Sequence, residues 1–399
     1  MRGRSLLPAT PHFLSQSSEC YDECVTATDV VIIGGGLVGS LCALRLAEAG
    51  ARVVVLEKSV PGAEASSAAA GILAAQSESK QPGLLFDLAI ESRALYARLA
   101  EELRDRVGGE IGYARCGVME SAANDEALVA LEAQFAWQRA RGHRVEHLSR
   151  DEAHVREAGL GPSIAGGLFF PDDAQVDPPR LVRSVARAAE RAGATFRSGA
   201  YVRRVRVEGS AARGVELDDG SFVAGHVVVA AGAWSALVEG ARVPSGAVKP
   251  ARGQIVELLT RVPPVEAVIY GAGGYVVPRR DGRVICGSTL EFVGYRNEVT
   301  VEGVMKILTM ATTLVPTLAQ ATVSRTWSNF RPFTNDGAPL VGESGIEGLT
   351  IATGHYRSGI LMAPITAEIV RDRVLERASR WDLASIAPTR ASIREGAVS

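Results

Sequence analysis

The stretch DVVIIGGGLVGSLCALRLAEAGARVVVLEK, residues Asp29–Lys58, decides the fold of this 399-residue chain. Its apolar runs at Val30–Ile33 and Val53–Leu56 predict two buried β-strands. Between the runs lie a glycine-rich turn and a segment that predicts a helix ending near Gly50. A strand, a glycine-rich turn, a helix and a second strand form the unit from which doubly wound parallel sheets are built. The sequence therefore predicts an α/β fold that begins with a Rossmann-like domain.

The glycines of this turn are spaced for binding a dinucleotide. Gly34 permits the tight turn, Gly36 lets the backbone approach a pyrophosphate, and Gly39 lets the helix pack closely on the strand. The helix N-terminus offers free N–H groups and a positive dipole end to phosphates. Glu57, 21 residues after Gly36, stands where a carboxylate hydrogen-bonds the adenosine ribose. We infer dinucleotide binding over the alternative of a glycine turn without a ligand; the pattern alone leaves FAD and NAD open.

Composition and charge limit the classes of protein to consider. The length suggests two or three domains, and 47% hydrophobic with 22% charged residues is typical of a globular protein with a sizeable core. A formal charge of −2 gives no electrostatic reason to expect nucleic acid or an anionic membrane. No apolar run reaches the roughly 18 residues that span a bilayer. The five cysteines form neither a disulfide framework nor a zinc pattern, so we expect no metal site and a reduced, cytoplasmic setting.

Periodicity places the remaining elements. Residues 1–28 predict a disordered N-terminal extension, with a targeting segment as the alternative, and residues 386–399 a C-terminal tail. Helices are predicted over residues 84–103, 124–141, 178–192, 304–315 and 360–378. Strands are predicted over residues 227–231, 251–259, 274–278, 283–288 and 349–353. The pattern is α/β at both ends of the chain, with mixed antiparallel β-structure between them.

Five further motifs follow the glycine turn in order. They are SSAAAGIL (66–73), ARGQIVEL (251–258), GGYVVPRRDGRVICGSTLE (273–291), NFRPFTNDGAPLVG (329–342) and IATGHYRSGILMAP (351–364). With the turn and Glu57, they make the chain resemble the D-amino-acid oxidase superfamily of FAD-dependent amine oxidases, and most closely its glycine oxidase branch from thiamine biosynthesis. The resemblance covers residues 29–378. It implies a Rossmann-like FAD-binding domain and an α+β substrate domain whose antiparallel sheet covers the flavin.

The resemblance also implies a discontinuous division of the chain. Residues 29–95, 174–245 and 335–385 are expected to form the FAD-binding domain, and residues 96–173 and 246–334 the substrate-binding domain. The resemblance assigns the ADP half of the cofactor to Gly34, Gly36, Gly39 and Glu57, with Val202 on the adenine side. Further cofactor contacts are assigned to Ser67, Ala69, Ala70, Gly71, Ala231, Gly232, Trp234, Gly354, His355, Arg357, Ser358, Gly359 and Ile360.

Three features of these assignments concern the flavin itself. Sarcosine oxidases of the superfamily attach FAD through a cysteine in the C-terminal half, but Trp327–Gly342 contains none, so we expect noncovalent FAD. His355 is expected to pack against the flavin and not to act as a base. The helix opened by Gly359–Ile360 is expected to aim its positive dipole end at the pyrimidine end of the flavin; the alternative is that Gly359 only starts a helix.

Three residues are expected to handle the substrate. Arg331 and Tyr275 match the family's carboxylate-binding pair, and Arg357 matches the position beside the substrate amine. A planar, permanently charged guanidinium suits a carboxylate better than an ammonium group does. The alternatives are a structural ion pair for Arg331 and a core aromatic for Tyr275.

The implied reaction is FAD-dependent oxidative deamination of glycine or another small amino acid. A hydride passes to the flavin, water hydrolyses the resulting imino acid to the 2-oxo acid and ammonia, and molecular oxygen reoxidises the flavin to give hydrogen peroxide. The cofactor carries this chemistry, while the protein supplies orientation and electrostatics. The resemblance also suggests a homo-oligomer that passes its imine to a thiazole synthase.

Departures from the family pattern leave alternatives open. Ser358 stands where asparagine is common, and Gly273-Gly274 removes side chains before Tyr275, which would admit a larger substrate. One alternative is therefore an oxidase or dehydrogenase of a bulkier D-amino acid or an N-methyl amino acid. Another is a flavin-binding partner protein without turnover, although retention of Arg331 and Tyr275 argues against it.

Overall fold

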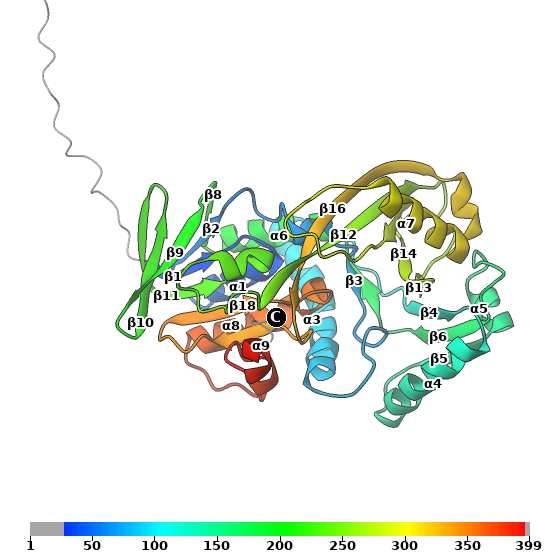
Figure 1. The fold of residues 1–399 in the computed structure, drawn as a ribbon, viewed down its shortest axis with the longest axis horizontal. Helices are drawn as coiled ribbons and strands as arrows, with labels where there is room; N and C mark the ends of the chain where they lie inside the picture. Colours follow the sequence, from blue (N-terminus) through cyan, green and yellow to red (C-terminus); the bar gives the residue numbers. More distant parts are fainter. Residues whose placement is uncertain (1–27, 396–399) are drawn as a thin grey trace, which may run out of the picture.

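The computed structural model describes residues 28–395. Residues 1–27 of the predicted N-terminal extension lie outside the described residues, whereas Thr28 is the first residue of strand β1 (Thr28–Ile33). The predicted C-terminal tail begins at the end of η3 (Ala384–Ile386) and contains the short helix α9 (Ala391–Glu395). Figure 1 shows two sheets toward opposite ends of the molecule, and the long strands β12 and β16 form the edge of the second sheet nearer the middle of the view.

The first sheet is built around β1, in the order β17-β18-β11-β1-β2-β8. Its other strands are β2 (Val53–Glu57), β8 (Thr195–Ser198), β11 (Gly220–Val229), β17 (Leu340–Glu343) and β18 (Leu349–Thr353). β1 pairs in parallel with both β2 and β11, so that Ile33 lies opposite Leu56 and Val229. β9 (Val202–Glu208) and β10 (Ala211–Leu217) continue from β11 as antiparallel strands. The central strands are apolar on both sides because other elements cover both faces.

Four helices form the core on one face of this sheet: α1 (Leu37–Glu48), α3 (Leu84–Val107), α6 (Pro178–Arg191) and α8 (Gly359–Val374). The side chain of Asp177 caps α6 by accepting a hydrogen bond from the Arg180 N–H at 3.3 Å, and prolines occupy the first turn, as the sequence predicted. The other face carries a second core with β9, β10 and η1 (Gly232–Leu237). The sheet is therefore covered on both sides, as in a doubly wound α/β domain.

The second sheet has the order β16-β12-β15-β14-β13-β4-β6-β5. Its strands are β4 (Val118–Ala122), β5 (Glu146–Ser149), β6 (Gly166–Phe170), β12 (Val248–Leu259), β13 (Val268–Gly271), β14 (Gly274–Pro278), β15 (Arg283–Gly287) and β16 (Thr322–Thr334). All neighbouring pairs are antiparallel except β13 with β4. Around it lie α4 (Asp125–Ala140), α5 (Arg150–Arg156), α7 (Val301–Leu314) and η2 (Pro316–Gln320). The α/β fold with a second, largely antiparallel sheet agrees with the prediction.

Between the two sheets lie the short helix α2 (Ala65–Ala68) and a two-stranded sheet of β3 (Ile72–Leu73) and β7 (Ala174–Gln175). The predicted division of the chain into domain segments stays a prediction, and its boundary at residue 95 falls inside α3. Among residues 28–395, no helix is long and apolar enough to cross a membrane.

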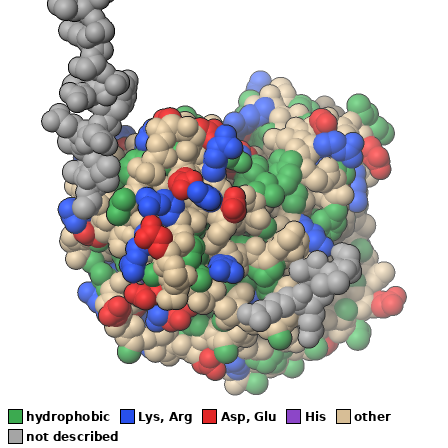
Figure 2. All heavy atoms as spheres, turned by 60° about the vertical axis from the view of Figure 1, so that its left-hand side comes forward, with side chains coloured by type: hydrophobic (Ala, Val, Ile, Leu, Met, Phe, Trp, Pro, Cys, Tyr) green, Lys and Arg blue, Asp and Glu red, His purple; other side chains and the backbone are tan. Residues whose placement is uncertain are grey.

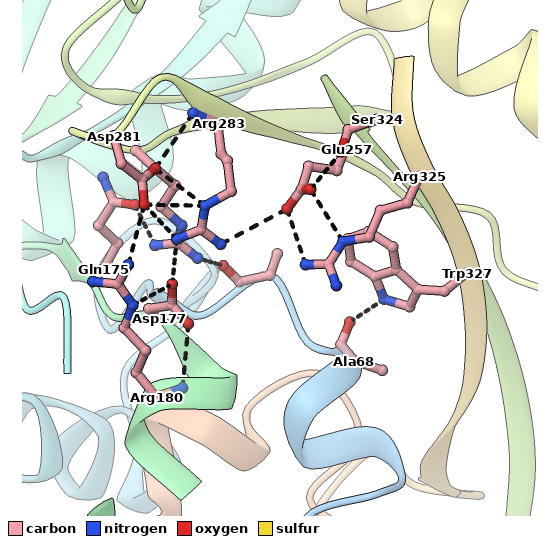
Figure 3. A network of polar contacts seen from close by, with 12 residues as sticks. Ala68, Gln175, Asp177, Arg180, Glu257, Asp281, Arg283, Ser324, Arg325 and Trp327 are labelled. Atoms are coloured by element: carbon pink, nitrogen blue, oxygen red, sulfur yellow. Dashed lines mark hydrogen bonds and ion pairs between the residues drawn. The ribbon is translucent and has the colours of Figure 1, made fainter. Parts of the chain in front are cut away.

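A polar seam joins the second sheet to the start of α6 and to residues 65–71 (Figure 3). Arg283 of β15 donates from Nη2 to Oδ2 of Asp177 at 2.5 Å, and so ties β15 to the start of α6. The Trp327 indole of β16 donates to the carbonyl of Ala68 in α2 at 2.9 Å. The buried guanidinium of Arg279 donates to the carbonyl of Ala70 at 2.6 Å. The small-residue stretch 65–71 is thus held in place from the second sheet.

The arginines of β9 lie at the surface, each beside a carboxylate. Arg203 pairs with Asp218, Arg204 with Glu216 at 2.6 Å, and Arg206 with Glu208 at 2.9 Å. In Figure 2, which turns the β9–β10 end of the molecule forward, basic and acidic side chains are interspersed. This mixture gives no basic patch on that face that would attract a polyanion.

Candidate functional site

One cavity runs from the glycine turn to the face of the second sheet. The predicted site residues that line it are Gly34, Gly36, Glu57, Ala69, Ala70, Gly71, Val202, Ala231, Gly232, Trp234, Tyr275, Arg331, His355, Arg357, Ser358, Gly359 and Ile360. They come from segments far apart in the sequence that meet where the strands of the first sheet end. The fold therefore brings nearly all predicted cofactor and substrate residues to one place.

Three predicted residues do not line this cavity. A Cβ on Gly39 would lie 2.0 Å from the Gly34 carbonyl oxygen, so Gly39 serves the close packing of α1 on its turn. Gly354 has φ +74°, and a Cβ there would lie 2.6 Å from the Thr334 side chain. Ser66, not Ser67, is the serine on the cavity wall, where its Oγ accepts the Leu37 N–H at 2.9 Å.

The glycine turn has the geometry of a phosphate cradle. Gly34 has φ +104°, and a Cβ there would come within 2.6 Å of the Ala230 carbonyl oxygen. At Gly36 a Cβ would meet only Ser66 Oγ, at 3.1 Å; Ser66 Oγ accepts the Leu37 N–H, and the N-cap residue Gly36 has no side chain to bond the other N–H groups of the first turn. The turn therefore leaves backbone N–H groups of α1 facing the cavity, where a pyrophosphate is favoured.

Glu57 ends β2 beside this turn, with its carboxylate held by the backbone. Its Oε2 accepts the Gly35 N–H at 2.8 Å and its Oε1 accepts the Ser59 N–H at 2.9 Å. Carboxylate oxygens can accept further hydrogen bonds, so Glu57 remains able to bind a ribose hydroxyl. The glycine cradle and Glu57 together fit the ADP half of FAD.

An aromatic wall closes one side of the cavity. Trp234 and Phe330 line it, and Tyr295 packs against both rings at centroid distances of 5.6 and 5.7 Å. The Lys58 ammonium lies 3.5 Å from the Trp234 ring centroid and 2.8 Å from Oε1 of Glu64. Lys58 and Phe330 were not among the predicted site residues, because nothing in their local sequence distinguishes them from core or surface positions.

The two predicted carboxylate-binding side chains lie on the cavity face of the second sheet. Arg331 donates from Nη2 to Ser288 Oγ at 2.5 Å and from Nη1 to the Thr289 carbonyl at 3.3 Å. Among the described residues no carboxylate forms an ion pair with Arg331, and no group hydrogen-bonds the Tyr275 hydroxyl. A guanidinium without a carboxylate partner and a phenol without a hydrogen-bond partner are thus available on one wall, and both can donate to a carboxylate.

Arg357 was predicted to stand beside the substrate amine, and in the structure its guanidinium contacts the Glu78 carboxylate. Its Nη2 donates to Oε1 of Glu78 at 2.9 Å, and the Tyr270 hydroxyl donates to the same oxygen at 2.6 Å. Burial raises the pKa of Glu78, but the Arg357 guanidinium and the Tyr270 hydroxyl outweigh it, and the pKa is lowered overall. Glu78 is therefore a charged carboxylate in the cavity wall.

Sequence reasoning missed Glu78 and Tyr270 as site residues. Glu78 lies seven positions after Gly71, the last residue of the small-residue stretch. Its partners Tyr270 and Arg357 are 192 and 279 positions away in the sequence. The Glu78 carboxylate raises the pKa of Arg357, and burial together with Glu78 raises that of Tyr270 well above its ordinary value. Both partners thus stay protonated, and Glu78 is the acceptor of the group.

His355 is buried, and its imidazole is hydrogen-bonded to a side chain of α8. Its Nε2 lies 2.9 Å from the Thr366 hydroxyl of α8, and it is 5% exposed. Burial lowers its pKa to about 4. The imidazole is therefore neutral near pH 7 and a poor proton acceptor; that it packs against the flavin and does not act as a base stays a prediction.

Helix α8 opens at the cavity, and α3 holds its first turns. Pro364 lies inside α8 and has no N–H to donate to the Ile360 carbonyl, which instead accepts the Tyr96 hydroxyl at 2.5 Å. The Ser92 hydroxyl donates to the Leu361 carbonyl at 2.6 Å and accepts the Ile365 N–H at 3.2 Å. These side chains fix the start of α8, whose positive end favours negative charge.

Comparisons with known proteins agree with this geometry. Residues 29–373 match the family model described as DAO, FAD dependent oxidoreductase. The chain is 38% identical to the glycine oxidase of Geobacillus kaustophilus (strain HTA426), over 91% of this chain and 97% of that protein. The crystal structure of a glycine oxidase from Geobacillus kaustophilus superposes with a TM-score of 0.88 and covers 91% of this chain and 99% of that one. A protein of Nostoc named bifunctional protein ThiO/ThiG is 35% identical over 88% of this chain and 53% of its own length.

Proposed function

Because the chain belongs to the DAO family of FAD-dependent oxidoreductases, we propose that it is an FAD-dependent amino-acid oxidase that deaminates glycine or a comparably small amino acid. The products are the 2-oxo acid, ammonia and hydrogen peroxide, and FAD is bound without a covalent link. The named relatives are glycine oxidases, which favours small amino acids over the bulkier alternatives.

One observation carries the proposal. Arg331 without a carboxylate partner and Tyr275 with a free hydroxyl lie in the same cavity as the glycine cradle and Glu57. A carboxylate held by the first pair is therefore enclosed together with a cofactor held by the second. That arrangement is what amino-acid oxidation requires, since the substrate must be oriented against the cofactor.

In this scheme the substrate is gripped at both ends by side chains of the chain. Arg331 and Tyr275 hold its carboxylate by charge-assisted hydrogen bonds. Glu78, which lies in the same cavity and is charged, accepts an N–H of the substrate amine, while Arg357 and Tyr270 fix the position of the Glu78 carboxylate. Arg357 thus acts through Glu78 as a positioning residue.

The redox step belongs to the cofactor, because no described cavity residue offers hydride chemistry. Bound FAD supplies an acceptor for the hydride that leaves the substrate Cα. His355 is a poor proton acceptor because its pKa is lowered to about 4, and α8, held by Tyr96 and Ser92, presents its positive end to negative charge at the cavity. The imino acid is released to water and gives the 2-oxo acid and ammonia.

Anaerobic mixing tests the function directly. Purified protein loaded with FAD should lose its flavin absorbance on addition of glycine, and in air it should produce equimolar peroxide and glyoxylate. Sarcosine and D-alanine, tested in parallel, report the alternatives of an N-methyl or a bulkier amino acid. Protein that does not take up FAD, or whose flavin none of these amino acids reduces, would contradict the proposal.

We also propose a homo-oligomer and a thiazole synthase as partner. The support for the partner is that relatives of the chain carry the name ThiO/ThiG and are about twice its length, so that this chain spans about half of them. Light scattering of the purified protein, and co-purification with a separately expressed thiazole synthase, test the two statements independently.

A further inference from the structure

The cavity face of the second sheet has two glycines beneath the two carboxylate-binding side chains. In the antiparallel register of β12 with β16, Arg331 lies opposite Ala251 and Gly253 lies opposite Asn329. Gly253 is therefore the diagonal neighbour of Arg331 on the same face, within reach of a long side chain. Across β14 and β15, Tyr275 lies directly opposite Gly287.

The guanidinium of Arg331 occupies the space that a side chain at position 253 would need. A Cβ built on Gly253 would lie 2.1 Å from Nη1, 2.4 Å from Nη2 and 2.5 Å from Cζ of Arg331. On its other side the guanidinium is held by Ser288 Oγ and the Thr289 carbonyl. The guanidinium thus lies flat on the bare backbone of Gly253, with its position fixed from two sides.

The phenol of Tyr275 uses the second glycine in the same way. A Cβ on Gly287 would lie 2.7 Å from the Tyr275 hydroxyl oxygen and 2.9 Å from Cζ. Both glycines are buried, and neither has a positive φ. Their backbone conformations therefore do not require glycine, and the space that they leave is used by the two substrate-binding side chains.

We propose that Gly253 and Gly287 are positioning residues for the substrate carboxylate, because they leave the space in which Arg331 and Tyr275 lie. The inference rests on the proposed function and adds to it the two glycines that determine the positions of the Arg331 guanidinium and the Tyr275 hydroxyl. At position 253 the clash falls on the end of a flexible side chain. Alanine there displaces the guanidinium from its place in the cavity while the fold is kept.

The experiment uses the FAD-loaded enzyme and two ligands. Glycine gives kcat and KM, and acetate, which has a carboxylate but no amine, gives a dissociation constant from the change in flavin absorbance without turnover. Gly253→Ala should raise the KM for glycine and the acetate dissociation constant at least tenfold, with unchanged FAD content. Gly225→Ala is the control, because it is a strand glycine whose Cβ would meet its nearest atom at 3.4 Å; both values should stay within twofold of wild type.

A double-mutant cycle separates positioning from general disruption. In the Arg331→Ala background, Gly253→Ala should have no further effect on acetate binding, because the group that it displaces is gone. Wild-type acetate affinity in Gly253→Ala, or the same loss with and without Arg331, would overturn the inference. If Gly253→Ala does not fold, Gly287→Ala with Tyr275→Ala provides the same cycle, because Tyr275→Ala removes the ring atoms that a Cβ at position 287 would meet. Failure of glycine to reduce the wild-type flavin would instead refute the proposed function, since the acetate measurements do not depend on turnover.

Discussion

Arg357 and Glu78, 279 positions apart in the sequence, form an ion pair with 2.9 Å between Nη2 and Oε1 in the cavity wall. The pair places a carboxylate where the sequence led us to expect only a guanidinium. Because the Arg357 charge is offset by Glu78, the positive charge available to a substrate carboxylate is concentrated on Arg331. In the proposed function, the cavity would thus be divided into a carboxylate side at Arg331 and an amine side at Glu78.

This division predicts different effects of Glu78→Gln on two ligands. The amide keeps the shape of Glu78 but removes the charge that accepts a substrate N–H. We expect the KM for glycine to rise about tenfold, since hydrogen bonds to charged groups contribute about 1.5–3 kcal/mol. Acetate, which has no amine, should bind at least as tightly as to wild type when followed by flavin absorbance, because the Arg357 charge is no longer offset by Glu78. Equal weakening of both ligands would show that Glu78 is not an amine-side group.

Substitution of Arg331 should affect the carboxylate side alone. Arg331→Ala should lower kcat/KM for glycine about 100-fold, mostly through KM, because two charge-assisted hydrogen bonds are lost. Arg331→Lys should recover only part of this loss, since an ammonium cannot form the planar bidentate contact. Steady-state kinetics and flavin content are the measurements. Arg213→Ala, at an exposed position of β10, is the matched control and should behave as wild type.

The parts of the fold that could be predicted are those fixed by neighbours in the sequence. The Gly34 turn, α1 and β2 follow one another within 30 residues, so periodicity and glycine spacing were sufficient to place them. The start of α6 could be read from Asp177 and the two prolines after it. The end of α8 could not be predicted. The helix was expected to reach residue 378 but ends at Val374, and two residues later Glu376 has φ +53°, a left-handed conformation that glycine usually adopts.

The parts that could not be predicted depend on contacts between distant segments. Glu78 has no local signal, and only the approach of Tyr270 and Arg357 makes it a site residue. In α2 the choice between Ser66 and Ser67 depends on which side of one helical turn faces the cavity, and it is Ser66 that faces it and accepts the Leu37 N–H. The motifs therefore located the cavity to within a residue or two, while tertiary contacts determined which side chains enter it.

Burial of His355 should make stability depend on pH in a defined window. Its pKa is lowered from 6.5 to about 4, so between these values the unfolded chain binds a proton that the folded one does not. The free energy of unfolding should accordingly fall as the pH decreases from 6.5 to 4, by about 3 kcal/mol from this group. Urea unfolding of His355→Gln should show a smaller loss over that window. A variant slope equal to that of wild type would contradict the assignment.

Asp177 has two roles in the polar seam, as the cap of α6 and as the ion-pair partner of Arg283, and substitutions at this position should distinguish their contributions to stability. Asp177→Asn keeps an oxygen for the Arg180 N–H but removes the charge beside Arg283, and should cost about 2 kcal/mol because the pair is largely buried. Asp177→Ala should cost about 1 kcal/mol more through loss of the cap. Asp219→Asn, in an exposed pair with Arg197, should cost under about 1 kcal/mol. Equal effects of Asn and Ala at position 177 would show that the cap contributes nothing.

The Tyr96 hydroxyl should contribute to stability because Pro364 leaves the Ile360 carbonyl of α8 without its helical N–H partner. The buried Ile360 carbonyl has no N–H four residues later to pair with, and the Tyr96 hydroxyl takes that place at 2.5 Å. Tyr96→Phe should therefore lower the free energy of unfolding by about 1–3 kcal/mol, the cost of an unsatisfied buried acceptor. Adding Pro364→Ala restores a backbone N–H that can close the helical bond to Ile360, so the double variant should be more stable than Tyr96→Phe alone. If the second change brings no recovery in urea unfolding, the hydroxyl has a role other than replacing the bond that the proline removes.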